Sequence, residues 1–220
     1  VLAPASVQEM ADFVDLGFQL AFKYRNPAII LADGVIGQMM EKVVLPEQRT
    51  RLTDEEVIAR CPWATTGRTH HRTPNIITSL ELDPAEMEKR NIHLQKKYAE
   101  IEENEVRFEE LHCEDSEYLI VAFGSCARIA QKAMEMAREE GIKVGLLRPI
   151  TLWPFPSKAI AARAAQVKGI LTVELNAGQM VEDVRLAVKC KVPVEHFGRL
   201  GGIVPDPDEV ITALKEKLIK

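Results

Sequence analysis

From residue 118 onward the sequence alternates between short apolar runs and amphipathic stretches, and this alternation constrains the fold more than any other feature. Wholly apolar runs of this length are typical of strands that are buried on both faces of a parallel sheet. We predict strands over residues 118–123, 143–147, 169–175 and 192–197, with a helix after each and Asp206 capping the last helix. Repeated strand–helix units predict the α/β class, namely a mostly parallel sheet covered by helices.

The first part of the chain reads as one helix followed by one strand. Ser6 and Glu9 have the spacing of a capping box, and apolar side chains recur at helical spacing over residues 6–24. Residues 28–32 form a wholly apolar run that predicts a central buried strand, and Asp33 follows at its carboxyl end. Carboxyl ends of parallel strands are where open α/β sheets usually place ligands or partner contacts.

Three parts can be distinguished along the chain. A helix and a single strand cannot fold alone, so we expect residues 1–46 to be the truncated end of an α/β domain. The chain also begins without Met, and we expect a fragment or processed piece of a longer polypeptide. Residues 47–117 contain prolines at 62, 74 and 84 and a polar stretch over residues 65–72, and they predict a connector with one charged helix over residues 84–103. Residues 118–220 predict a complete domain that folds independently.

Composition excludes several classes of protein. The 28 Lys and Arg residues and 33 Asp and Glu residues are interleaved and give a net charge of −5, which argues against nucleic-acid binding. The four cysteines form no C-x-x-C motif, so local spacing predicts neither a zinc site nor an iron–sulfur cluster. His70, His71, His93 and His112 match no zinc pattern either. We find no apolar run long enough for a membrane span and no signal peptide, and we expect a cytoplasmic protein with free thiols.

Three loops at strand ends are candidates for a ligand or interface site, because parallel strands bring their carboxyl ends to one edge. The candidate residues are Gly124, Ser125, Asn176, Gly178, Gln179, Gly201 and Gly202. Helix N-termini at that edge favour an anion or a partner carboxylate. Simpler interpretations stay open: Ser125 caps its helix while Gly124 permits the turn, and Asn176 caps the helix that follows it.

Motifs of known chemistry do not occur in these 220 residues. Phosphate-loop, dinucleotide-binding and G-x-S-x-G patterns are all absent from the sequence. We therefore assign no catalytic residue, no cofactor-binding residue and no metal ligand from the sequence.

Several blocks of the sequence nevertheless resemble a known family. The blocks are residues 1–10, 23–39, 122–125, 147–156 and 173–180. The first two resemble the end of the pyrimidine-type thiamine domain in the alpha subunit of 2-oxoacid:ferredoxin oxidoreductases, and the last three resemble its transketolase C-terminal-like domain. Thr66, Gly67, Asn75, residues 79–80 and residues 97–105 look most like the branched-chain, 2-oxoisovalerate members.

This resemblance implies an oxidative decarboxylation of a 2-oxoacid on thiamine diphosphate, with the acyl group captured by coenzyme A and electrons passed through [4Fe-4S] clusters to ferredoxin. It also implies that beta and gamma or delta subunits complete a hetero-oligomer. The family's thiamine-activating residues precede Val1, its diphosphate and Mg²⁺ site lies on the beta subunit, and its cluster cysteines lie on other subunits. We therefore expect this chain alone to be inactive and to bind neither thiamine diphosphate nor iron.

Two alternatives belong to other classes. One is a subunit of another thiamine enzyme, such as a 2-oxoacid dehydrogenase beta chain or a transketolase-like synthase, although the connector argues against it. The other is a non-catalytic module that binds a small anion or serves as a scaffold through its strand-end loops.

Overall fold

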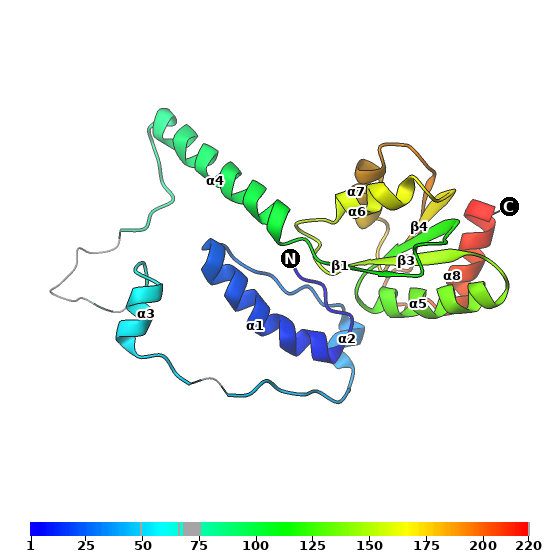
Figure 1. The fold of residues 1–220 in the computed structure, drawn as a ribbon, viewed down its shortest axis with the longest axis horizontal. Coiled ribbons are helices and arrows are strands. Elements are labelled where there is room, and N and C mark those ends of the chain that lie inside the picture. The colour runs from blue at the N-terminus through cyan, green and yellow to red at the C-terminus, as the bar shows by residue number, and fades with distance from the viewer. Residues whose placement is uncertain (49, 66, 68–75, 220) are drawn as a thin grey trace.

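The computed structural model describes residues 1–48, 50–65, 67 and 76–219 (Figure 1). Its helices are α1 (Val7–Tyr24), α2 (Gly34–Gln38), α3 (Asp54–Arg60), α4 (Pro84–Asn104), α5 (Gly124–Glu139), α6 (Ser157–Ala164), α7 (Met180–Val188) and α8 (Pro207–Leu214), and a π-helical turn covers Lys215–Ile219. Its strands are β1 (Phe108–Leu111), β2 (Tyr118–Ala122), β3 (Val144–Pro149), β4 (Gly169–Glu174) and β5 (Val194–Gly198).

The predicted α/β class is confirmed. In the described chain the strands form one sheet in the order β1-β3-β2-β4-β5, in which β2 to β5 run parallel and β1 runs antiparallel to β3. The four predicted strands agree with β2, β3, β4 and β5 to within two residues. The capping box of the last helix is also present, since Asp206 accepts from the Glu209 N–H and Glu209 accepts from the Asp206 N–H.

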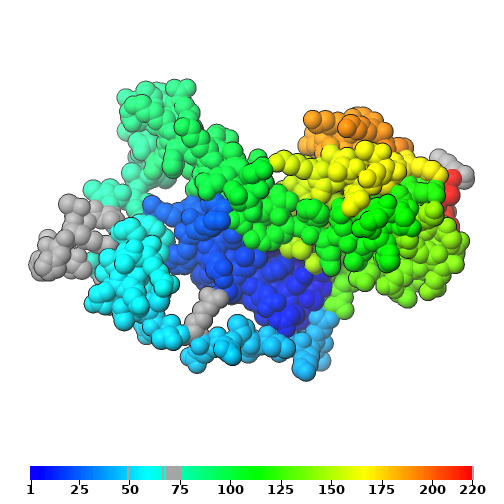
Figure 2. Space-filling view, viewed as in Figure 1, coloured from blue at the N-terminus to red at the C-terminus, as the bar shows by residue number. Residues whose placement is uncertain are grey.

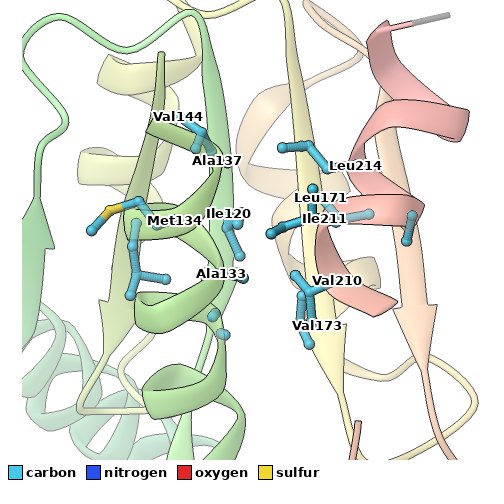
Figure 3. Packing of buried hydrophobic residues seen from close by; sticks show 14 of the residues in the cluster. Ile120, Ala133, Met134, Ala137, Val144, Leu171, Val173, Val210, Ile211 and Leu214 are labelled. Carbon is cyan, nitrogen blue, oxygen red and sulfur yellow. The ribbon is translucent and has the colours of Figure 1, made fainter. Parts of the chain in front are cut away.

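Two apolar cores lie on opposite faces of this sheet. Successive residues alternate between them, as expected for pleated strands: Ile120 faces α5 and α8, and Val121 faces α6 and α7. Figure 3 shows the first core, where Ala133 of α5 lies beside Ile120 and Leu214 of α8 lies beside Leu171. Coverage on both faces explains why β2, β3 and β4 are mostly apolar and were recognisable in the sequence.

The connector contains elements that the sequence analysis did not predict. Helix α4 begins where expected, with the Asp83 carboxylate accepting from the N–H groups of Ala85 and Glu86. Helix α3 and strand β1 were not predicted, so the sheet begins at Phe108 rather than at Tyr118. Helix α2, which lies in the first part of the chain rather than in the connector, was not predicted either. His70 and His71 lie outside the described residues.

The first part of the chain differs from its prediction in two ways. Ser6 caps α1 as expected, but the Glu9 carboxylate accepts from the Ala5 N–H rather than completing the predicted capping box. The predicted buried strand over residues 28–32 is wrong, because only Ile30 forms a bridge, with Leu2, and Ile29 remains 53% exposed. The described chain offers this segment only residue 2 as a strand partner, so the apolar run is not enclosed.

The N-terminal residues connect this first part to the sheet domain. The Ala3 N–H donates to the Ile150 carbonyl, and the Leu152 N–H donates to the Val1 carbonyl, each at 2.8 or 2.9 Å. On its other side Leu2 exchanges hydrogen bonds with the backbone at residues 29 and 31. Figure 2 shows the result, with the first part of the chain (blue) lying directly against the sheet domain (green to red).

Candidate functional site at the carboxyl edge of the sheet

A cavity of about 200 Å³ lies where the carboxyl ends of β2 and β4 meet the segment that precedes α2. We call it the edge cavity. Its lining residues are Leu31, Ala32, Asp33, Phe123, Gly124, Cys126, Glu174, Leu175, Asn176 and Gln179. Two of the three predicted loops therefore meet here, together with a segment from the first part of the chain.

Asp33 joins two helix N-termini at this cavity. Its Oδ1 accepts from the N–H groups of Val35 and Ile36 at 3.0 Å and so caps α2, and its Oδ2 accepts from the Ser125 N–H of α5 at 2.9 Å. Gly124 has a φ of +61°, and a Cβ there would lie 2.8 Å from Asp33 Oδ2. Gly124 therefore permits both the turn and the close approach of the carboxylate.

Ser125 does not cap α5, so that simpler interpretation was wrong. Phe123 occupies the N-cap position, and Ser125 lies inside the first turn with 3% of its surface exposed. Among the described residues its Oγ has no hydrogen-bond partner. The Ser125 backbone, rather than its side chain, makes the contact with Asp33.

Glu174 accepts hydrogen bonds from the N-terminus of α7, as Asp33 does from the N-termini of α2 and α5. It is 1% exposed, and its two carboxylate oxygens accept from the N–H groups of Gln179, Met180 and Val181 at 2.8 to 3.1 Å. Asn176 does not cap α7, because its Oδ1 accepts from the Gly178 N–H at 2.7 Å and closes a local turn. The buried carboxylate of Glu174 therefore caps the N-terminus of α7, and Asn176 closes a turn in the loop that precedes the helix.

The neighbouring strand approaches this loop very closely. A Cβ on Gly198 of β5 would lie 2.2 Å from the carbonyl oxygen of Asn176 and 2.6 Å from Nε2 of His196. His196 lies between the loop and Glu174, with Nε2 at 3.3 Å from that carbonyl and Nδ1 at 3.4 Å from Glu174 Oε1. Glycine at position 198 is thus needed for β5 to pack beside the loop.

The third predicted loop begins beside the cavity but does not line it. The Arg199 N–H donates to the Glu174 carbonyl at 3.2 Å, after which the chain turns away. Gly201 and Gly202 have φ values of +66° and +86°, are exposed, and have open space around them. The same loop exposes three apolar side chains, Leu200, Ile203 and Val204.

Cys126 is a cavity residue that the sequence analysis did not single out, since an isolated cysteine inside a helical pattern carries no signal. Burial, together with the negative charges of Asp33 and Glu174, raises the pKa of its thiol to about 12. The thiol therefore stays protonated and is no nucleophile at neutral pH.

The edge cavity does not fit a bound diphosphate. The helix N–H groups that would hold phosphate oxygens already donate to Asp33 and Glu174, and these carboxylates make the cavity wall negative. Its volume is also below the several hundred Å³ typical of cofactor pockets. In the described part of the chain, no group of three or more His, Cys, Asp or Glu side chains could hold a metal ion. None of the described helices is both long and apolar enough to cross a membrane.

Taken with the fold, these contacts define an α/β protein in which the carboxyl edge of a mostly parallel sheet packs against the first part of the chain. Residues 1–112 match the family model described as pyruvate flavodoxin/ferredoxin oxidoreductase, thiamine diphosphate-binding, and residues 116–210 match pyruvate:ferredoxin oxidoreductase core domain II. The chain belongs to this pyruvate flavodoxin/ferredoxin oxidoreductase family.

Among similar proteins, the ketoisovalerate oxidoreductase subunit VorB of Methanothermobacter marburgensis is 45% identical over 98% of this chain and 59% of its own length. The 2-oxoglutarate synthase subunit KorA of Archaeoglobus fulgidus is 32% identical over 94% of this chain and 58% of its own length. The chain thus spans less than two thirds of these relatives. The resemblance to a 2-oxoacid:ferredoxin oxidoreductase subunit, most like the 2-oxoisovalerate type, is confirmed.

One solved structure shows the same fold. It is a 2-oxoglutarate:ferredoxin oxidoreductase from Magnetococcus marinus, which matches with a TM-score of 0.73 at 24% identity over 98% of this chain and 41% of its own. Because both parts of the chain match one family, the comparisons argue against the dehydrogenase, transketolase-like and scaffold alternatives.

Proposed function

We propose that this chain is part of the alpha subunit of an enzyme that oxidatively decarboxylates 2-oxoisovalerate, transfers the acyl group to coenzyme A and passes two electrons to ferredoxin. The observation that carries the proposal is the 45% identity to the ketoisovalerate oxidoreductase subunit, against 32% to the 2-oxoglutarate synthase subunit. Identity along nearly the whole chain supports a shared substrate class.

In this proposal the chain does not perform the chemistry alone. Thiamine diphosphate, Mg²⁺ and [4Fe-4S] clusters are carried by other segments or by the beta and gamma or delta subunits, and the enzyme is a cytoplasmic hetero-oligomer. The negative edge cavity supports this division, since it suits neither a diphosphate nor an anionic substrate. Four unpaired cysteines support a reducing compartment.

The role that we assign to this chain is structural support at the edge of the active site. Residues 1–46 end the pyrimidine-type thiamine domain, residues 47–117 form the connector, and residues 118–220 form the transketolase C-terminal-like domain. The loops with Gly124 and Ser125, with Asn176 to Gln179, and with Gly201 and Gly202 serve subunit association. Asp33 supports this assignment, because it bonds the first part to α5.

The test uses the complete subunits, co-expressed and purified together. We expect coenzyme A-dependent reduction of ferredoxin or a viologen dye, with kcat/KM for 2-oxoisovalerate at least about tenfold above that for 2-oxoglutarate or pyruvate. Assays without coenzyme A or thiamine diphosphate are the controls. A preference for 2-oxoglutarate would contradict the proposed substrate but not the family.

A further inference from the structure

Helix α1 carries a ridge of apolar side chains on its exposed face. Val14, Phe18 and Phe22 are spaced four residues apart, so they lie in one row along the helix, and Val14 and Phe18 are 49% and 64% exposed. Trp63 of the connector stacks on the ring of Phe22 at one end of this row. We call the row the α1 ridge. Contiguous apolar surface of this kind is typical of a contact site rather than of a solvated helix face.

Helix α4 carries a surface of complementary shape. A shallow, mostly apolar groove of about 690 Å³ runs along one face of this helix, and we call it the α4 groove. It is lined by Pro84, Met87, Glu88, Asn91, Ile92, Gln95, Lys96 and Ala99. Within one chain the two helices meet at their last turns, where Glu105 accepts from Lys23 and Tyr24. From there α4 runs away from α1, and its first turns stand clear of the body (Figures 1 and 2).

The two helices also carry opposite charges. Residues 7–22 contain three acidic residues and no Lys or Arg, whereas residues 89–99 contain four Lys or Arg residues and no acidic residue. Asp15 follows Val14 of the α1 ridge directly in the chain, and Lys96 lines the α4 groove. Opposite charges beside matching apolar surfaces favour one specific pairing and fix its register.

We propose that the α1 ridge of one copy of this chain packs into the α4 groove of a second copy. Rows of side chains spaced four residues apart commonly pack into the grooves of a neighbouring helix. At 1.5 Å per residue the ridge is roughly 12 Å long and the groove roughly 22 Å, so the ridge fits within the groove.

The charges and shapes favour a second copy over another occupant. Each copy offers one acidic ridge and one basic groove, so a two-fold axis repeats the contact and covers both apolar surfaces of both copies at once. A different protein would have to supply a basic groove and an acidic ridge of its own. The inference does not depend on which 2-oxoacid the enzyme uses.

Charge reversal across the contact provides the test. Lys96→Glu brings a negative charge to the acidic ridge, and Asp15→Lys brings a positive charge to the basic groove. The double variant Asp15→Lys with Lys96→Glu restores opposite charges. Lys191→Glu, at an exposed position of the sheet domain, is the matched control for the change in net charge. The complete subunit carrying each variant is studied by sedimentation velocity over a range of concentrations.

We expect the wild-type subunit to form pairs, and each single reversal to raise the dissociation constant about tenfold or more. The double variant should return to within about threefold of wild type, because the charges of the two positions are coupled. Lys191→Glu should leave the dissociation constant unchanged. Phe18→Ser should also weaken pairing about tenfold, while its melting temperature stays that of wild type because Phe18 is exposed.

Several outcomes would overturn the proposal. They are a monomeric wild-type subunit, pairing that the single reversals do not weaken, and a double variant that does not recover. Loss of the pairs when the other purified subunits bind would also overturn it, because another subunit would then occupy the ridge. Self-association is measured without substrate, so a failed 2-oxoacid assay of the assembled enzyme tests the proposed function separately.

Discussion

At the scale of single residues, two of the three loops that the sequence singled out lie together in the structure, but the sequence did not predict their partners. Gly124, Ser125, Asn176 and Gln179 were recognisable because each follows a buried strand, where a parallel sheet gathers its loops. The partner of Ser125 is Asp33, which lies 92 residues earlier in the chain. Nothing in local spacing encodes such a contact, so the sequence predicted open helix N-termini where the structure shows occupied ones.

Asp33→Ala tests this contact. We expect a loss of about 2 kcal/mol in unfolding free energy, because the change removes a helix cap and the bond to α5 together. The matched control is Asp83→Ala, which removes the cap of α4 and touches no other element, and should cost only about 1 kcal/mol. Urea unfolding measures both, and equal losses would show that the bond to Ser125 contributes nothing.

Gly198→Ala tests the close approach of β5 to the loop at residue 176. A Cβ only 2.2 Å from a backbone oxygen forces one strand to shift, and we expect about 2 kcal/mol or more of destabilisation. Gly37→Ala is the control, because it lies in α2 with open space around it and should be neutral or slightly stabilising. Similar melting temperatures for wild type and Gly198→Ala would contradict the packing.

At the scale of elements, prediction succeeded for the strands that follow the repeated strand–helix pattern, including the edge strand β5, and failed for the edge strand β1 and for residues 28–32. Strands β2 to β5 were predicted because their side chains fill the two cores. Strand β1 was missed because its sequence, Phe-Glu-Glu-Leu, reads as polar, and it pairs only at the edge of the sheet. The run over residues 28–32 was predicted as a buried strand because it is apolar. An apolar run indicates a strand that packs against neighbouring strands, but it does not show that the chain contains those neighbours.

The contact between α1 and β3 depends on a single buried cation. Arg148 donates both terminal nitrogens to Glu9 at 2.8 Å and its Nε to Glu109 at 2.9 Å. Arg148→Ala should cost about 3 kcal/mol, because two partly enclosed carboxylates lose their partner. In a Glu9→Ala background, Arg148→Ala should lower the unfolding free energy by clearly less than it does in the wild type. A double-mutant cycle, followed by urea unfolding, measures this difference.

An exposed ion pair provides the comparison for this cycle. Lys158 and Glu103 pair at 2.6 Å with most of both side chains in solvent, so Lys158→Ala should cost less than about 1 kcal/mol. If Arg148→Ala costs no more than Lys158→Ala, the buried network does not hold α1 against the sheet.

At the scale of the whole molecule, carboxylates whose pKa values are lowered join the first part of the chain to the connector, through Glu105, and to the sheet, through Glu9. Burial alone would raise the pKa of Glu105, but hydrogen bonds from Lys23, Tyr24 and Arg107 outweigh it and lower the pKa to about 2. For Glu9, likewise, burial is opposed and outweighed by hydrogen bonds from Arg148 and Ala5, which lower its pKa. The unfolded values lie near 4.3.

These pKa values predict acid sensitivity. Because the folded values are the lower ones, the stabilisation is fully present above about pH 4.5 and is lost as the pH falls toward about 2. Unfolding by urea at several values between pH 7 and pH 3 should show stability decreasing below pH 4.5. The decrease should be shallower in Glu105→Gln, and an identical slope in that variant would contradict the assignment.

The same contacts predict how the molecule responds to a cut in the connector. Lys42, Arg51 and Arg60 are exposed on the segment between α2 and the end of α3, so trypsin should cleave there before it cleaves the sheet domain.

After that cut, the peptide of residues 1–42 should stay bound to the rest, because its attachment does not depend on the connector. Residues 1–3 pair with the backbone at 150–152, Glu9 binds Arg148, and Asp33 binds the N-terminus of α5. Gel filtration of the nicked protein, followed by mass spectrometry, should find both pieces in one peak for the wild type. In Arg148→Ala the peptide should separate more readily, and its release from wild type would show that the connector, rather than these contacts, holds the two parts together.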